Sequence, residues 1–426
     1  MPNLSVLGAQ WGDEGKGKVV DFYARHADLV VRYAGGSNAG HTLVVNGRKL
    51  AVHLLPSGVA RPGTLCVLGD AMVIDPTALL TEIDDLGRVG HPIDEASLRV
   101  SGRAHLVLPY HQELDALREG GPTAIGTTRR GIGPAYEDKM ARRGVRVIDL
   151  LKPARLRQRL EPALSEAAAR IEQLGGAPPD LETVLARLVE QGERLRPYVA
   201  DTGVLIAEAI DAGRTVLFEG AQGGLLDIDH GTYPFVTSST TVAGGIGAGT
   251  GVGPHLLGAL VGVAKAYVTR VGEGPLPTEI TGEDQERVRK LGDEFGSTTG
   301  RPRRCGWLDL PALRYVVRVS GLQWLALTKL DILAGLERIP VCEAYRLRGR
   351  VIEHLPADPD DLAAVEPVYR EMEGFPPLRG DERAVEELPA GARAYVQMVE
   401  RALGIGVCLV SIGPAREDTI VCHALP

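Results

Sequence analysis

Residues 12–18, with the sequence GDEGKGK, have the composition of a phosphate-binding loop. They satisfy the GxxxxGK pattern, in which backbone N–H groups and a helix start surround phosphate oxygens while lysine adds positive charge. Val19 stands where that pattern needs the Ser or Thr that holds magnesium. Another oxygen must then bind the metal, and Asp13 inside the loop is the nearest candidate. We predict phosphate binding here, although a purely structural glycine-rich turn would give the same letters.

A second glycine-rich segment, GGSNAGHT at 35–42, directly follows an apolar run. Its glycines tolerate tight backbone geometry near a ligand, and His41 is a candidate donor to the charge that develops on a phosphoryl group. A single histidine in a turn is more often a surface or structural residue. On its own this motif is therefore weak.

The sequence TKLD at 328–331 closes an apolar run and is similar to the NKxD motif of guanine-selective sites. In such sites the carboxylate accepts hydrogen bonds from the base and the lysine stem covers the ring. Lys329 and Asp331 occupy those places, with Thr328 replacing Asn. An ordinary salt bridge at a strand end is a competing interpretation. With a phosphate loop elsewhere, the pattern favours GTP over ATP.

Two further loops combine glycine, threonine and arginine, at 126–144 and at 297–307 (STTGRPRRCGW). The second contains Arg301, Arg303 and Arg304, whose guanidinium groups suit bidentate binding of carboxylates or phosphates. A solvated run of charges is the alternative. The glycine and threonines favour a shaped anion site.

Three other patterns are discounted. The glycine run at 244–253 fits no GxGxxG register and is predicted to be a flexible or tightly turned loop. Asp84-x-x-Gly87 matches a GTPase switch motif, but it lies in a helix-like segment. The DIDH sequence at 227–230 resembles a metal cluster but lacks a second ligand group at suitable spacing.

Short apolar runs alternate with longer amphipathic ones along the chain, which predicts an α/β fold with a parallel sheet. The first helix is predicted at 18–27, and strands are predicted at 4–9, 28–35, 63–70, 215–221, 261–269, 324–331 and 407–414. Several of these strands end directly before the motifs above. In open parallel sheets, ligands bind at those carboxyl ends.

The segment from about 150 to 213 is predicted to be helical, with a GGAPPD break at 175–180. Residues from about 346 to 395 are polar and proline-rich and are predicted to form a surface subdomain. Internal repeats and long linkers are not visible. We therefore expect a single domain, 1–426, that carries these two insertions.

The composition narrows the class of protein. The net charge of −8 gives no global attraction to nucleic acid or to an anionic membrane. No apolar stretch reaches the roughly 18 residues of a membrane helix, since Lys265 interrupts the best candidate, and no signal peptide is visible. The five cysteines are scattered without a CxxC pair, which favours a reducing compartment. We expect a cytoplasmic protein.

Taken together, the motifs resemble those of the adenylosuccinate synthetase family. The resemblance runs from residue 8 to about 420 and rests, in order, on WGDEGKGK, GGSNAGHT, IGTTRRGIGPAYEDK, EGAQGGLLDIDHGTYPFVTSS, TTGRPRR, TKLD and VSIGP. It implies a fold like that of P-loop NTPases, with a large, mostly parallel central sheet and flanking helices. It also implies a homodimeric ligase that uses GTP and Mg²⁺ to join IMP and L-aspartate. The products would be adenylosuccinate, GDP and phosphate, in the first committed step from IMP to AMP.

The resemblance also implies roles for individual residues. Asp13 would remove the N1 proton of IMP so that O6 attacks the γ-phosphate, giving a 6-phosphoryl intermediate, and His41 would act as general acid or charge stabiliser. Asp13 and the Gly40 carbonyl would bind Mg²⁺. The implied GTP-binding positions are Gly12, Asp13, Glu14, Gly15, Lys16, Gly17, Lys18, Gly40, His41, Thr42, Arg303, Lys329, Leu330, Asp331, Ser411, Ile412 and Gly413.

The two other substrates have implied positions as well. Those for IMP are Asp13, Lys16, Asn38, Ala39, Gly40, His41, Thr128, Arg142, Gln222, Thr237 and Arg301, with Arg142 arriving from the other subunit. Those for aspartate are Thr298, Thr299, Gly300, Arg301 and Arg303. The chain departs from the family pattern at Arg129, where glycine is usual, and at Gly374-Phe375, where Pro-Gly-Trp is more usual.

Two other classes of protein share some of these features. A regulatory GTP-binding switch needs a phosphate loop and a guanine motif, but it should carry Ser or Thr at 19 and would not use the TTGRPRR loop. A nucleotide kinase shares the phosphate cradle, but it usually lacks a guanine motif and a carboxylate inside the loop.

Overall fold

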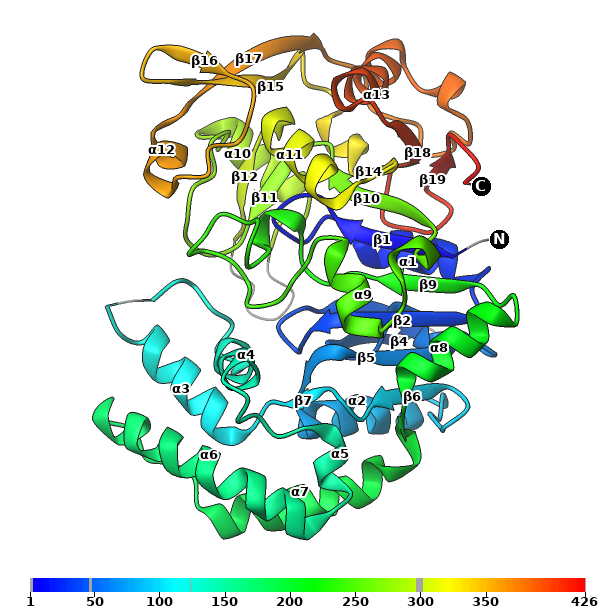
Figure 1. Ribbon diagram of the computed structural model, residues 1–426. Coiled ribbons are helices and arrows are strands. Elements are labelled where there is room, and N and C mark those ends of the chain that lie inside the picture. Colours follow the sequence, from blue (N-terminus) through cyan, green and yellow to red (C-terminus); the bar gives the residue numbers. More distant parts are fainter. Residues whose placement is uncertain (1–2, 46–47, 123, 296–301, 426) are drawn as a thin grey trace.

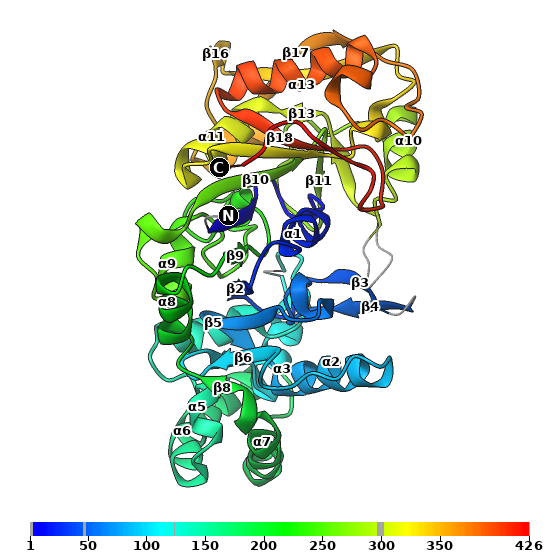
Figure 2. The ribbon, with the colours of Figure 1, turned by 90° about the vertical axis from the view of Figure 1, so that its right-hand side faces the viewer.

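The computed structural model describes residues 3–45, 48–122, 124–295 and 302–425. A large sheet runs through the molecule, with helices on both faces (Figure 1 and Figure 2). Its strands lie in the order β19 (Thr419–Val421), β18 (Gly406–Ser411), β14 (Trp324–Thr328), β10 (Ala259–Lys265), β1 (Leu4–Gly8), β9 (Val216–Glu219), β2 (Leu29–Gly35), β5 (Leu65–Ile74), β6 (Leu98–Ser101) and β8 (Val199–Ala200), with β7 (His105–Leu106) paired to β5. All these pairs are parallel except β18 with β19. The predicted fold class is confirmed.

Both faces of the sheet are buried, so its strands appear in the sequence as continuous apolar runs. In β2, Val30 packs with side chains of α1 (Lys16–Ala24) and α2 (Pro76–Arg88). The next residue, Val31, points to the other face and packs with α8 (Thr202–Asp211) and α9 (Gly244–Thr250).

A group of helices covers the β6 end of the sheet (Figure 1). It contains α3 (Pro109–Glu119), α4 (Ile132–Met140), α5 (Val147–Leu150), α6 (Pro153–Gln173) and α7 (Leu181–Leu195). The predicted break at 175–180 separates α6 from α7. The segment predicted as helical therefore consists of α6, α7 and α8, with the short β8 before α8.

A smaller sheet and its helices occupy the other end of the molecule (Figure 1). These elements are α10 (Glu283–Leu291), β13 (Leu308–Asp309), α11 (Leu310–Ser320), β15 (Arg338–Leu347), β16 (Arg350–Ile352), α12 (Pro359–Ala364), β17 (Glu366–Glu373) and α13 (Ala390–Leu403). Met372, Phe375 and Leu388, all within 346–395, are buried in the same apolar cluster as Val31. This polar segment thus shares a buried apolar core with the rest of the chain.

Two antiparallel strand pairs and several 3-10 helices complete the fold. The pairs are β3 (His41–Val45) with β4 (Arg48–Val52), and β11 (Val268–Arg270) with β12 (Arg304–Gly306). The 3-10 helices are η1 (Ser57–Ala60), η2 (Arg196–Tyr198), η3 (Gly224–Leu226), η4 (Pro254–Leu256), η5 (Leu330–Leu333) and η6 (Val385–Glu387). Within the described ranges, no helix is long and apolar enough to cross a membrane.

The structure corrects four local predictions. The glycine run at 244–253, predicted as a loop, forms α9, because glycine lets this helix lie directly on the backbone of Tyr33. The single strand predicted at 261–269 is two strands, β10 and β11, and the strand predicted at 324–331 ends at Thr328. The first helix begins at Lys16, two residues earlier than predicted.

The sheet order explains how distant motifs meet. The strands β18, β14, β10, β1, β9 and β2 are consecutive neighbours and run in the same direction. Their carboxyl ends therefore lie at one edge of the sheet. The segments 411–413, 329–331, 9–15, 220–222 and 36–41 all emerge there.

Candidate active site

The loop between β1 and α1 is folded around a buried carboxylate. Glu14 Oε1 accepts hydrogen bonds from the backbone N–H groups of Gln10 (3.1 Å) and Gly12 (2.9 Å), and Oε2 lies 2.5 Å from Lys16 Nζ. Asp13 has a φ of 56°, a left-handed conformation that is uncommon for a non-glycine residue. Glu14 thus shapes the loop from inside, while Asp13 projects from it.

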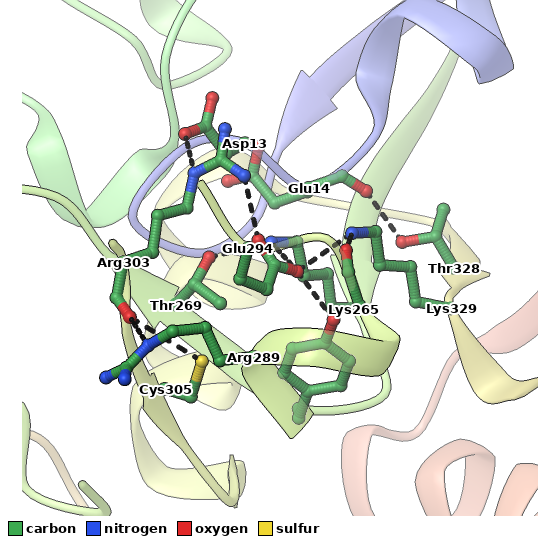
Figure 3. Close-up of polar contacts among 12 residues, drawn as sticks. Asp13, Glu14, Lys265, Thr269, Arg289, Glu294, Arg303, Cys305, Thr328 and Lys329 are labelled. Carbon is green, nitrogen blue, oxygen red and sulfur yellow. Dashed lines mark hydrogen bonds and ion pairs between the residues drawn. The ribbon is translucent and has the colours of Figure 1, made fainter. Parts of the chain in front are cut away.

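Asp13 is held by an arginine that is distant in the sequence. Its side chain is 43% exposed, and Arg303 Nε donates to Asp13 Oδ2 at 2.8 Å. A second nitrogen of Arg303 pairs with Glu294 Oε2 at 2.9 Å (Figure 3). Two predicted site residues, 290 positions apart in the sequence, are thereby in direct contact.

Glu294 is the centre of a charged cluster that the sequence analysis missed (Figure 3). Its Oε1 accepts from Lys265 Nζ (2.8 Å), Lys329 Nζ (2.9 Å) and the Tyr267 hydroxyl (2.5 Å), and the carboxylate is fully buried. Burial alone would raise its pKa, but the two ammonium groups lower the pKa of Glu294 to about 2. Burial lowers the pKa of Lys265 to about 8, against the opposing effect of Glu294. The one signal in the sequence was a lysine inside an otherwise apolar strand.

His41 begins β3 and has a buried ring nitrogen, Nε2, without a hydrogen-bond partner among the described residues. Burial lowers the pKa of His41, so the ring is neutral near pH 7. The adjacent Gly40 needs its small size, because a Cβ there would come within 2.7 Å of His53 Nδ1. His53 Nδ1 in turn lies 3.0 Å from the Ala39 carbonyl.

Another buried charge, also missed by the sequence analysis, supports the same turn. Arg32 in β2 donates to the carbonyls of Gly36, at 2.8 Å, and His53. It is 2% exposed. This arginine fixes both ends of the segment that presents His41.

The predicted IMP residues come together from distant segments. Asn38 Nδ2 donates to Thr237 Oγ1 at 3.4 Å. Gln222, with a φ of 63°, lies beside the phosphate loop, since a Cβ on Gly12 would be 3.8 Å from Gln222 Oε1. The turn before Thr237 is built on Asp227, whose carboxylate accepts four backbone N–H groups, those of Asp229, His230, Thr241 and Val242.

Among the predicted guanine residues, Asp331 carries a second buried, unpartnered atom. Asp331 Oδ1 has no hydrogen-bond partner in the described part of the chain, and burial raises the pKa of Asp331. Lys329 adopts a φ of 57° and reaches Glu294 and the Gly292 carbonyl. The side chains of Leu330 and Ile412 are buried in the core.

The remaining predicted residues are less enclosed or lie elsewhere. Gly17 approaches His41, because a Cβ on Gly17 would be 3.3 Å from His41 Cβ. Thr128 and Arg142 are exposed, and Arg142 follows α4 with a φ of 63°. Thr42 belongs to β3. Thr298, Thr299, Gly300 and Arg301 lie outside the described residues.

Comparison with known proteins agrees with this geometry. The family model for adenylosuccinate synthetase matches residues 5–420. The adenylosuccinate synthetase of Myxococcus xanthus is 51% identical, over 99% of this chain and 98% of the relative, and that of Desulforudis audaxviator is 51% identical over the same shares. A structure of fully ligated adenylosuccinate synthetase from Plasmodium falciparum superimposes with a TM-score of 0.93 at 36% identity, covering 99% of this chain and 100% of the other.

The match covers nearly the whole chain in both sequence and structure. It includes the six-strand sheet edge at which the phosphate loop, the His41 turn and the guanine segment meet. The chain belongs to the adenylosuccinate synthetase family, the ligases that join IMP and L-aspartate at the expense of GTP.

Proposed function

We propose that the chain performs this ligation with Asp13 as the base, His41 at the transferring phosphoryl group and Asp331 at guanine. The observation that carries the proposal is the pair of buried, unpartnered atoms, His41 Nε2 and Asp331 Oδ1, on two segments that flank the phosphate loop. A buried polar atom without a partner costs about 1–3 kcal/mol, and in this proposal the bound nucleotides supply the missing partners of these two atoms.

In the first step, Asp13 removes the proton from N1 of IMP. The purine O6 then attacks the γ-phosphorus of GTP, the bond to the bridging oxygen breaks, and GDP leaves. Arg303 orients the Asp13 carboxylate through Oδ2. The His41 ring is neutral before nucleotide binds, and it donates one N–H to an oxygen of the transferring group.

In the second step, the aspartate amine attacks C6 of the 6-phosphoryl intermediate, and inorganic phosphate leaves with the former O6. Arg303, with Thr298, Thr299, Gly300 and Arg301, binds the aspartate carboxylates. The purine nucleotide is held by Lys16, Asn38, Ala39, Gly40, Thr128, Gln222, Thr237 and Arg301. The contact between Asn38 and Thr237 supports this arrangement.

The donor atoms near the phosphate loop suit Mg²⁺. This ion is usually bound by one or two carboxylates together with substrate phosphates and waters. It is rarely enclosed by protein ligands alone. Asp13 provides an exposed carboxylate, and Gly40 provides a carbonyl. In the described ranges no group of three or more His, Cys, Asp or Glu side chains forms such a cage. Bound Mg²⁺ would neutralise charge on the GTP phosphates.

The active unit in this proposal is a homodimer in the cytoplasm. Arg142 is exposed on a turn after α4 with a φ of 63°, and we assign it to the IMP site of the second copy. All five cysteines are free, and four are buried, as suits a reducing compartment.

The first test omits one component at a time from a mixture of IMP, GTP, Mg²⁺ and L-aspartate, while the absorbance of the purine is followed. We expect a spectral change only when all four are present. GTP hydrolysis that needs neither IMP nor aspartate would instead indicate a GTP-binding switch.

The second test replaces the proposed base. Asp13→Asn should lower kcat by roughly 10³-fold, because general base catalysis contributes about 10²–10⁴-fold. The dissociation constant of IMP should change little. Asp21→Asn is the matched control. Asp21 lies in α1, the helix that follows the phosphate loop, and like Asp13 it pairs with arginine, in this case Arg61 and Arg416. Substantial turnover by Asp13→Asn would remove Asp13 from the role of base.

A further inference from the structure

Lys18 occupies the lysine position of the GxxxxGK pattern, where a lysine normally binds phosphate. In the structure its ammonium group points elsewhere. Lys18 Nζ donates to Ser411 Oγ at 2.7 Å, to the Gly413 carbonyl at 2.7 Å and to the Asp418 carbonyl at 3.0 Å. An ammonium group has three hydrogens, so these contacts use all of them.

Ser411 is the last residue of β18, and Gly413 and Asp418 lie in the loop between β18 and β19, so all three acceptors are almost 400 residues from Lys18 in the sequence. In Figure 2 this red loop descends beside α1. Within the loop, the Ile412 N–H donates to the Asp418 carbonyl at 3.0 Å, and the Ala415 N–H donates to Asp418 Oδ2 at 2.9 Å. The loop thus closes on itself, with two of its carbonyls turned toward Lys18.

The same loop carries the proposed guanine contacts at Ser411 and Gly413. Its strand, β18, is the sheet neighbour of β14, which leads to Asp331. The charges of Lys18 and Asp331 lie close enough to influence one another. Lys18, in the first turn of α1, therefore joins this helix to the segment that carries two of the proposed guanine contacts.

We propose that Lys18 is a positioning residue for base recognition, which holds the 411–418 loop in place against Asp331 and does not bind phosphate. This inference rests on the proposed function, because it takes Asp331, Ser411 and Gly413 as the guanine site. The phosphate-binding lysine of the loop is then Lys16 alone, whose ammonium group pairs with the buried carboxylate of Glu14.

The test separates base binding from phosphate binding by using guanosine, which has no phosphate, as a competitive inhibitor against GTP. Lys18→Met keeps the aliphatic stem and removes the three donors. We expect the inhibition constant of guanosine and the KM of GTP to rise together, by roughly tenfold, because charged hydrogen bonds to the loop are lost. The values of kcat and of KM for IMP and aspartate should stay within about twofold. The preference for GTP over ITP, which lacks the 2-amino group, should narrow.

Two matched variants give the comparison. Lys16→Met should raise the KM of GTP and lower kcat, while the inhibition constant of guanosine stays unchanged. Lys152→Met, at an exposed lysine at the start of α6, should change neither the kinetic constants nor the inhibition constant of guanosine. Lys18→Gln, which keeps two amide hydrogens, should fall between the wild type and Lys18→Met, and it replaces Lys18→Met if that variant does not fold.

The outcomes that overturn the proposal are distinct. If Lys18→Met weakens the binding of GTP but not that of guanosine, Lys18 binds phosphate. If the binding of neither changes, the loop holds its shape without Lys18. Asp331→Asn reports on the underlying assignment: guanosine affinity that survives this change overturns the guanine site and the role of Lys18 with it. If guanosine affinity falls in Asp331→Asn but not in Lys18→Met, only the role of Lys18 is overturned.

Discussion

At the scale of single residues, Glu294 connects parts of the site that no local pattern joins. One buried carboxylate receives Lys329, from the guanine segment, and Arg303, which also holds Asp13. Lys265 shares the cluster and is itself fully buried, so its charge depends on Glu294. Removing one member of such a cluster leaves the others charged without compensation.

We expect Glu294→Gln to lower the free energy of unfolding by roughly 3–5 kcal/mol at pH 7, the usual cost of breaking a buried ion pair. The folded-state pKa of Glu294, about 2, lies below its ordinary value of 4.5. Its contribution to stability is therefore complete above about pH 4.5 and is lost as the pH falls toward 2.

Urea unfolding at pH 7, 5 and 3 measures this effect. The wild type should lose more stability between pH 5 and pH 3 than the Glu294→Gln variant does. Glu193→Gln is the control, since Glu193 pairs with Arg196 on the surface, and it should follow the wild type within about 0.5 kcal/mol. Equal pH dependence in the wild type and Glu294→Gln would show that the cluster is not a stabilising one.

At the scale of elements, the strained backbone is concentrated at the candidate site. Among the described residues, seven non-glycine residues have a positive φ, and Asp13, Arg142, Gln222 and Lys329 are four of them. Such conformations cost about 1–3 kcal/mol each and persist where the surroundings impose them. A fifth, Arg129, lies next to Thr128 in the turn before α4.

Arg129 offers a test of this strain, because its φ of 55° is one that glycine adopts without a Cβ penalty. We expect Arg129→Gly to raise the free energy of unfolding by about 1 kcal/mol. Arg130→Gly is the matched control: φ is not positive there, so glycine should destabilise the protein by roughly 0.5–1 kcal/mol. The measurement is chemical denaturation of both variants, and a loss of stability in Arg129→Gly would contradict the argument.

Much of the element scale could be predicted from the sequence. The apolar runs predicted β1, β2, β9 and β18 to within a few residues, because strands buried on both faces leave a strong local signal. The α9 helix was missed because seven residues rich in glycine have no helical signal of their own and form a helix through packing on the sheet.

The parts of the site that could not be predicted depend on long-range contacts. Lys18 and Ser411 are 393 residues apart, and Lys329 and Glu294 are 35 apart in different loops. Neither spacing forms a motif, so the Lys18 contacts and the Glu294 cluster can be recognised only in the folded structure. The phosphate loop and TKLD were found because each motif is short and contiguous.

At the scale of the whole molecule, the proposed dimer divides the site between what one chain supplies and what a second would add. The sheet edge gathers Asp13, His41 and Asp331 within one chain. Arg142, by contrast, is exposed beyond α4, on the helical group at the β6 end (Figure 1). If it completes the IMP site of a partner, the catalytic unit is the dimer, and each site uses residues of both copies.

Mixing two inactive variants tests this division. Asp13→Asn lacks its own base, and Arg142→Ala lacks the arginine given to its partner, so each homodimer has two defective sites. In a heterodimer one site carries both defects and the other carries neither. With random exchange of subunits, half of the dimers are heterodimers with one intact site, which predicts recovery of about a quarter of the wild-type activity. Recovery measured after mixing equal amounts would support shared sites, whereas no recovery, with exchange verified by differently tagged subunits, would place Arg142 in the site of its own chain or outside it.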